Sequence, residues 1–313
     1  MREYNYPLKV GITRTSEFER KGLATHVVNV GLKCGHDCCY CSSPSLLRCH
    51  PSFKKVGENP FGFGYCIVDP TTPARVERDV RKLKANDMVM FCSTSDAWAP
   101  EAQRLGLGEK CLEIVLMGSP AGIRVLTKNA SVVGAYDLIG AYRGRVRIGL
   151  SVTAPKSCES VACTLEPNAS SISERLDALQ EAHRRGLRTY GMLCPCLPGI
   201  ADSMEALDEM FESVLVCSAE DIWVEPVNPR GNGLARCVTA LTHAGLVEYA
   251  QAVNVVRTRS AWNEYAIRLV QTAQQVAERK GALDRLHVLL YSSSFARESV
   301  ITIKADQRGV IWL

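Results

Sequence analysis

Three cysteines near the N-terminus have the type and spacing of metal ligands. Cys34, Cys38 and Cys41 form a Cys-x3-Cys-x2-Cys pattern, and the aromatic Tyr40 precedes the last of them. Soft thiolates suit iron–sulfur clusters, and three of them on a short loop can hold three irons of a [4Fe–4S] cube. The fourth iron would have no protein ligand and would stay open to a small molecule.

Three other uses of these cysteines are compatible with the sequence. A structural zinc site prefers four ligands in paired sets, and no second pair follows, although His36 and His50 lie nearby. A ferredoxin-type cluster would need Cys39 or Cys49 as its fourth ligand. The third use is a chance grouping in a chain with 14 cysteines. Because Cys39 adjoins Cys38 on a tight loop, we expect its thiol to pack inside the protein.

Composition limits the class of protein. The 313 residues, 46% of them hydrophobic, are enough for one sizeable core, and α/β barrels of this size commonly form one domain. The net charge of +4 is mild, whereas a dedicated nucleic-acid binder would show a basic stripe. Residues 1 to 20 are polar, and no apolar run of about 18 residues is present, so we expect no membrane partner and a cytoplasmic location. The cysteines are then expected to be reduced.

Short apolar, β-branched segments alternate with helical patterns along the chain, which predicts a parallel sheet. The expected fold class is α/β, a partial, about six-stranded TIM-type parallel β/α barrel with a C-terminal extension. Residues 1 to 240 would form the barrel, with the cluster loop at 34 to 41, and residues 241 to 313 a helical extension and a last strand that complete the same domain. Strands are expected at residues 25–30, 88–92, 123–128, 146–152, 187–194, 222–227 and 287–291.

Between these strands the sequence predicts loops and helix starts. Residues 42 to 70, rich in proline and glycine, are expected to form a long loop over the site. Ser171 and Glu174 form a capping box, Asp202 is expected to begin the next helix, and residues 242 to about 280 have a helical pattern. Cys194 ends the fifth strand and Cys196 follows it, and the two thiols could bind a metal or a thiophilic substrate or donate hydrogen. We expect Cys194 to pack in the barrel and Cys196 to lie in a loop.

From about residue 25 to residue 233 the chain resembles the spore photoproduct lyase branch of the radical S-adenosylmethionine proteins. Five patches match in order, namely the cysteine loop, Thr94-Ser95-Asp96, Thr127-Lys128, Leu165-Glu166-Pro167 with Arg175, and Leu197-Pro198-Gly199. The resemblance implies two cofactors, a [4Fe–4S] cluster on Cys34, Cys38 and Cys41, and S-adenosylmethionine on the open iron. Reductive cleavage would yield a 5′-deoxyadenosyl radical that removes hydrogen from an unidentified substrate. The electron would come from a reductant such as flavodoxin or ferredoxin.

The resemblance also implies which residues bind S-adenosylmethionine. Ser95 would contact its methionine part, Lys128 would pair with its carboxylate, and Tyr40 would approach the adenine through its backbone. Arg175 is a weaker candidate for the carboxylate, and a structural Glu166–Arg175 ion pair is the alternative. Lys128 could also be a surface lysine. The expected cofactor-binding set is Tyr40, Ser95, Asp96, Lys128, Ser151 and Arg175.

One position departs from the branch. The lyases have a cysteine immediately before Thr-Ser-Asp, where it returns a hydrogen atom to the product radical, and this chain has Ser93 there. Cys92 lies one residue earlier, and on a regular strand adjacent side chains point to opposite faces. Cys92 and Ser93 are therefore the candidate catalytic residues.

Three alternative functions remain open at this point. The first is a noncanonical cleavage that transfers the 3-amino-3-carboxypropyl group of S-adenosylmethionine. The second is a DNA photoproduct lyase that uses Cys92. The third is a non-enzymatic metal-binding protein with a nucleic-acid partner, and a nucleic-acid partner is possible but not favoured.

Overall fold

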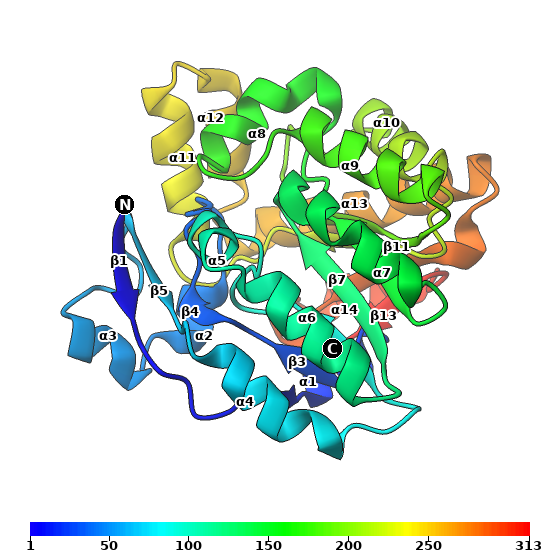
Figure 1. Cartoon of the computed structure of the whole chain (residues 1–313). Helices are drawn as coiled ribbons and strands as arrows, with labels where there is room; N and C mark the ends of the chain where they lie inside the picture. The colour runs from blue at the N-terminus through cyan, green and yellow to red at the C-terminus, as the bar shows by residue number, and fades with distance from the viewer.

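Parallel strands joined by helices make up most of the computed structural model, which describes residues 1–313 (Figure 1). One sheet has the strand order β2-β3-β6-β7-β8-β9 and a second has the order β10-β11-β12-β13. All neighbouring strands in both are parallel except β2 and β3. Their bounds are β2 Thr13–Arg14, β3 His26–Val28, β6 Met88–Phe91, β7 Gly122–Thr127, β8 Val146–Leu150, β9 Arg188–Thr189, β10 Gly191–Cys196, β11 Ile222–Pro226, β12 Leu286–Leu290 and β13 Val310–Trp312.

The two sheets meet at one point. An isolated parallel bridge joins Ser151, just after β8, to Met192 in β10. The succession β3-β6-β7-β8-β10-β11-β12-β13 therefore runs through both sheets, and each of the seven expected strands is present. The predicted α/β class with a parallel sheet is confirmed, while closure into a partial barrel stays a prediction.

Hydrophobic side chains pack on both faces of this succession of strands. On one face, a cluster of 73 buried residues lies between the strands and the surrounding helices. On the other face, a cluster of eight buried residues collects side chains from β3, β6, β10, β11 and β12, among them Val27, Met90, Met192, Trp223 and Leu289. Strands that are distant in sequence thus share one inner cluster. The main connecting helices are α4 Thr72–Asp79, α6 Leu107–Gly118, α7 Tyr136–Ala141, α9 Ile172–Arg184, α10 Met204–Leu215 and α13 Arg259–Arg279.

A small third sheet corrects the prediction of a long loop over residues 42 to 70. Its order is β1-β5-β4, with β1 at Arg2–Asn5, β4 at Gly31–Lys33 and β5 at Tyr65–Val68. Two short helices, α2 Ser43–Leu47 and α3 Pro51–Val56, occupy the first part of the segment. The prediction was wrong because β5 is stabilised by pairing with β1 and β4, which are separated from it in the sequence.

Helix boundaries follow local capping chemistry. The capping box of Ser171 and Glu174 at the start of α9 is confirmed. Asp202 does not cap α10; Ser203 does so by accepting from the N–H of Ala206 at 3.1 Å. The helical pattern of residues 242 to 280 divides into the end of α11 Gly233–His243, then α12 Val247–Val255 and α13. No helix has both the length and the apolar character needed to cross a bilayer.

Candidate active site

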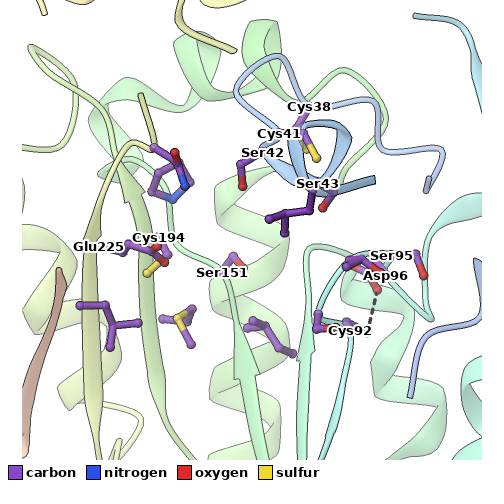
Figure 2. A pocket seen from close by; sticks show the side chains of 18 of the residues that line it. Cys38, Cys41, Ser42, Ser43, Cys92, Ser95, Asp96, Ser151, Cys194 and Glu225 are labelled. Atoms are coloured by element: carbon purple, nitrogen blue, oxygen red, sulfur yellow. Dashed lines mark hydrogen bonds between the residues drawn. The ribbon is translucent and has the colours of Figure 1, made fainter. Parts of the chain in front are cut away.

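A cavity of about 430 Å³ lies where the parallel strands end (Figure 2). The cysteine loop lies across it from the ends of the strands, which supply Ser95, Asp96, Ser151, Cys194 and Glu225. The carboxyl ends of parallel strands gather at one edge of a sheet, so residues distant in sequence meet there. Of the predicted site residues, those that line the cavity are Cys34, Cys38, Tyr40, Cys41, Cys92, Ser93, Ser95, Asp96, Lys128 and Ser151.

The three cysteines of the predicted cluster share this cavity. Burial raises the pKa of the Cys34 thiol to about 12, and the nearby Cys41 adds to the shift. Burial likewise raises the pKa of Cys38. No three His, Cys, Asp or Glu side chains are gathered closely enough around one point to hold a single metal ion. Cys39 is buried outside the cavity lining, and its backbone N–H donates to the carbonyl of Leu165 at 2.8 Å.

A buried ion pair ties the cysteine loop to the ends of β6 and β7. His36 Nε2 lies 3.0 Å from Asp96 Oδ2, which also accepts from the Lys128 N–H at 2.9 Å. The Thr127 hydroxyl lies 2.9 Å from both carboxylate oxygens, and the Trp98 N–H donates to Oδ1 at 2.9 Å. Burial opposes the charge of Asp96, but the attraction of His36 outweighs it and holds the pKa at about 2. Because protein donors occupy both oxygens, these contacts support a structural role for Asp96 in place of the predicted contact with a cofactor.

A second buried ion pair corrects the prediction for Arg175. The Arg175 guanidinium pairs with Glu166, and both side chains are only 1% exposed. It also donates to the carbonyls of Ser151 at 2.9 Å and Ser170 at 2.8 Å, and it does not line the cavity. Glu166 in turn accepts a hydrogen bond from the Tyr40 hydroxyl. Arg175 is therefore the structural partner of Glu166, and the pair fixes the Tyr40 ring of the cysteine loop.

Asn29, which the sequence reasoning missed, organises the turn that follows β6. Its Oδ1 accepts from the N–H groups of Ser93 at 3.0 Å, Thr94 at 2.9 Å and Ser95 at 3.3 Å. Its Nδ2 donates to the Ser93 hydroxyl at 2.8 Å, while the Ser95 hydroxyl donates to the Gly31 carbonyl at 3.0 Å. A single amide at the end of an otherwise β-branched strand was the signal available in the sequence.

Lys128 presents a free cation to the cavity. Its half-buried ammonium lies 5.8 Å from the centre of the Tyr40 ring, at the end of β7. Its own backbone N–H is held by Asp96, so the position of the residue is fixed while its charge remains available. A cation so placed can bind an anionic group such as a carboxylate.

Cys92 and Ser93 both line the cavity, contrary to the expectation that they face opposite ways. The strand β6 ends at Phe91, and Cys92 has a φ of +80°, a left-handed conformation in which strand alternation no longer holds. The Cys92 thiol donates weakly to Asp96 Oδ1 at 3.6 Å and accepts from the Ala97 N–H at 3.0 Å.

The predicted loop position of Cys196 is wrong, whereas Cys194 does pack against the inner cluster of buried residues, as predicted. Cys194 is half-buried and lines the cavity, whereas Cys196 is fully buried in the hydrophobic core at the last position of β10. The pairing of β10 with β11 shifts register between Leu193 and Cys196. That irregularity breaks the two-residue alternation, so the two thiols do not share a face.

One wall of the cavity, which the sequence did not predict, is formed by the charged residues Glu17, Lys21 and Glu225 together with Tyr291. Glu17, from α1 Ser16–Arg20, pairs with Lys21 at 3.1 Å and accepts from the Tyr291 hydroxyl at 3.0 Å. Burial raises the pKa of Glu225, more than the nearby Lys21 lowers it. The one signal for this wall was Glu225, a charge within the apolar strand Ile222–Pro226.

Comparison with known proteins gives relatives of uncharacterized function. No model of a known protein family matches the chain. An uncharacterized protein of Methanocaldococcus jannaschii is 23% identical over 179 residues, which are 57% of this chain and 63% of the relative. An uncharacterized protein of Mycobacterium tuberculosis is 23% identical over 227 residues, 71% of this chain and 65% of the relative. The chain thus spans slightly less than two thirds of the length of these relatives.

Solved structures provide the match in fold. A variant of spore photoproduct lyase superposes with a TM-score of 0.58 at 14% identity, over 89% of this chain and 79% of that one. Spore photoproduct lyase in complex with a dinucleoside spore photoproduct gives a TM-score of 0.54 at 15% identity, over 77% of this chain and 66% of that one. The resemblance predicted from the sequence is confirmed at the level of fold: the chain is built on the fold of the spore photoproduct lyases.

Proposed function

We propose that this chain is a radical S-adenosylmethionine enzyme with one [4Fe–4S] cluster on a partial TIM-type barrel. The observation that carries the proposal is that three cysteines in the pattern Cys-x3-Cys-x2-Cys line the same cavity as the ends of β6, β7 and β8. The match in fold to spore photoproduct lyase supports it.

The residues present fit the cofactors in donor chemistry. Cys34, Cys38 and Cys41 would hold the cluster, since three soft sulfur atoms are offered on one loop. Lys128 would bind the carboxylate of S-adenosylmethionine. The ring of Tyr40, a residue of the cysteine loop, lies near the Lys128 ammonium. Together the bound cofactors would supply a 5′-deoxyadenosyl radical, which removes a hydrogen atom from the substrate.

The protein itself would position these groups and exclude water. The His36–Asp96 pair fixes the cysteine loop against β6 and β7, and the Glu166–Arg175 pair fixes Tyr40. The Glu166–Arg175 pair lies outside the cavity lining, whereas His36 and Asp96 line the cavity with their charges already paired. Lys128 has no such partner, so its charge is available to a ligand. Orientation and shielding are the contributions a protein makes when a cofactor performs the difficult step.

Anaerobic reconstitution tests the proposal. The protein should hold about four irons and four sulfides per chain. With S-adenosylmethionine and reduced flavodoxin or dithionite it should release 5′-deoxyadenosine and methionine. Release of methylthioadenosine instead would indicate transfer of the 3-amino-3-carboxypropyl group. One zinc per chain with no cleavage of S-adenosylmethionine would contradict the proposal and favour a non-enzymatic metal-binding protein.

Repair of a DNA photoproduct through Cys92 is the second candidate, because Cys92 lines the cavity beside Ser93. We predict that repair is much slower than in the lyases, since Ser93 occupies the position of their hydrogen donor and the net charge is only +4. The assay is conversion of a dinucleotide spore photoproduct to thymidylyl-thymidine by the parent protein, Ser93→Cys and Cys92→Ala. Efficient repair by the parent that is lost in Cys92→Ala would make the second candidate correct.

A further inference from the structure

This inference rests on the proposed function and concerns how a substrate radical formed in the cavity ends as a C–H product. Such an ending takes a hydrogen atom from a weak X–H bond, and a thiol is a far better donor than the Ser93 hydroxyl. Outside the cysteine loop, the cavity is lined by two thiols, Cys92 and Cys194.

The Cys92 thiol is already engaged by the protein. It accepts from the Ala97 N–H at 3.0 Å and faces Asp96 Oδ1 at 3.6 Å. The dashed line in Figure 2 marks the contact between Cys92 and Asp96, at the base of the turn that follows β6. These contacts hold the Cys92 sulfur in the turn, although Cys92 and Asp96 both line the cavity.

Cys194 lies on the opposite wall, on the strand β10, and its thiol is only loosely held (Figure 2). Its Sγ lies 4.0 Å from the Trp223 carbonyl, and the Glu225 carboxylate is a second acceptor beside it. Two residues earlier, Met192 bridges to Ser151, the predicted cofactor contact at the end of β8. Residues two apart on a strand share a face, so Met192 and Cys194 both line the cavity next to Ser151.

The surroundings of Cys194 keep the hydrogen on sulfur. Burial raises the pKa of this thiol, and the neighbouring Glu225 raises it further, while the cations Lys128 and Lys21 oppose the shift less strongly. A thiol that stays protonated is the form that can donate a hydrogen atom. By contrast, Cys196 lies in the core and donates to the Leu193 carbonyl at 3.3 Å.

We propose that Cys194 is the hydrogen-atom donor of this cavity and a catalytic residue of the reaction. A C–H bond forms on the radical as the S–H bond of Cys194 breaks, so one hydrogen atom moves and no charge is transferred. The Cys194 thiyl radical returns to the thiol by taking one electron from the flavodoxin- or ferredoxin-class reductant and one proton from water.

Deuterium labelling tests the proposal without knowledge of the substrate. In D₂O the Cys194 thiol carries deuterium, and without substrate the 5′-deoxyadenosyl radical should take it, giving 5′-deoxyadenosine with one deuterium. Cys194→Ala should lose this label, whereas Cys163→Ala, an exposed thiol outside the cavity, should keep it. Label kept in Cys194→Ala but lost in Cys92→Ala would overturn the proposal and assign the role to Cys92.

Two further outcomes separate this inference from the function on which it rests. Unlabelled 5′-deoxyadenosine from the parent protein would refute the role of Cys194 while leaving the proposed function intact. Absence of 5′-deoxyadenosine from every variant would refute both.

A second measurement, of the chemical accessibility of Cys194, needs neither a bound iron–sulfur cluster nor enzymatic activity. Cluster-free protein is treated with N-ethylmaleimide at alkaline pH, and its cysteine peptides are identified by mass. Cys194 should be alkylated, though more slowly than the exposed Cys163 because its thiol stays mostly protonated, while Cys196 and the fully buried Cys111 should stay unmodified. Protection of Cys194 equal to that of Cys111 would contradict its placement in the cavity.

Discussion

Replacement of Arg175 by methionine tests whether the buried pair behind the cavity is structural. Both Arg175 and Glu166 are 1% exposed, so removal of one partner leaves a charge in a dry interior. Loss of one member of a buried pair costs about 3–5 kcal/mol. The total free energy of unfolding of a domain is about 5–15 kcal/mol. Arg175→Met should therefore lower the free energy of unfolding by a large fraction.

A double-mutant cycle isolates the coupling of the pair. Urea unfolding of the cluster-free protein at neutral pH would be measured for Arg175→Met, Glu166→Met and the double variant. The double variant should lose less free energy of unfolding than the two single losses combined, because it leaves no unpaired charge. Arg185→Met is the control. Arg185 pairs at the surface with Asp137, which is 94% exposed, and with Glu181, and such solvent-screened pairs contribute little to stability.

Two results would refute this reasoning. Losses in the single variants that add within about 0.5 kcal/mol in the double variant would show that Glu166 and Arg175 are not coupled. A stable Arg175→Met protein with greatly weakened binding of S-adenosylmethionine would show that Arg175 binds the cofactor, as first predicted from the sequence.

Three further predictions concern the cluster, the cofactor and pH. Alanine at any of the three predicted ligands should abolish the brown absorbance of the reconstituted protein, whereas Cys39→Ala should retain it; the ligands are Cys34, Cys38 and Cys41. Lys128→Ala should weaken calorimetric binding of S-adenosylmethionine without loss of iron, and unchanged affinity would exclude Lys128 from the site. Asp79→Asn should lower stability at pH 7, because hydrogen bonding from Arg78 and Gly11 outweighs burial and lowers the pKa of Asp79 in the folded protein. That stabilisation is present above the unfolded pKa of about 3.9 and is lost as pH falls, so parent and variant should converge in acid.

The sequence predicted the parallel strands well because each is a short apolar run followed by a helical pattern. It failed for β5, since Tyr65–Val68 becomes a strand by pairing with Arg2–Asn5 and Gly31–Lys33. Tyr65–Val68 is itself a short apolar run, but the prolines and glycines of the segment outweighed that signal. The three-residue strand β13 at Val310–Trp312 is likewise too short to show a pattern.

The predicted site residues did gather at one cavity, but their separate roles depend on contacts between distant residues. Asp96 is occupied by His36, 60 residues away. Arg175 is occupied by Glu166, only nine residues away just after α8 Glu159–Leu165, and the sequence had already offered this ion pair as the alternative. Cys92 and Cys194 depend on a positive φ and on a register shift, which residue types alone do not reveal. The types and spacing of the residues therefore identified the candidates, whereas the packing of the folded chain decides which of them face the cavity.

The hydrogen bond between Tyr291 and Glu17 joins residues 274 positions apart, and this separation sets an order of events during synthesis. Ribosomes add about 5–20 residues per second, so roughly 15–55 s pass between the emergence of the two partners. The cysteine loop at residues 34 to 41 is made early in that interval. The wall formed by Glu17, Lys21 and Tyr291 can close only near its end, so the cavity opposite the loop is among the last parts of the molecule to be completed.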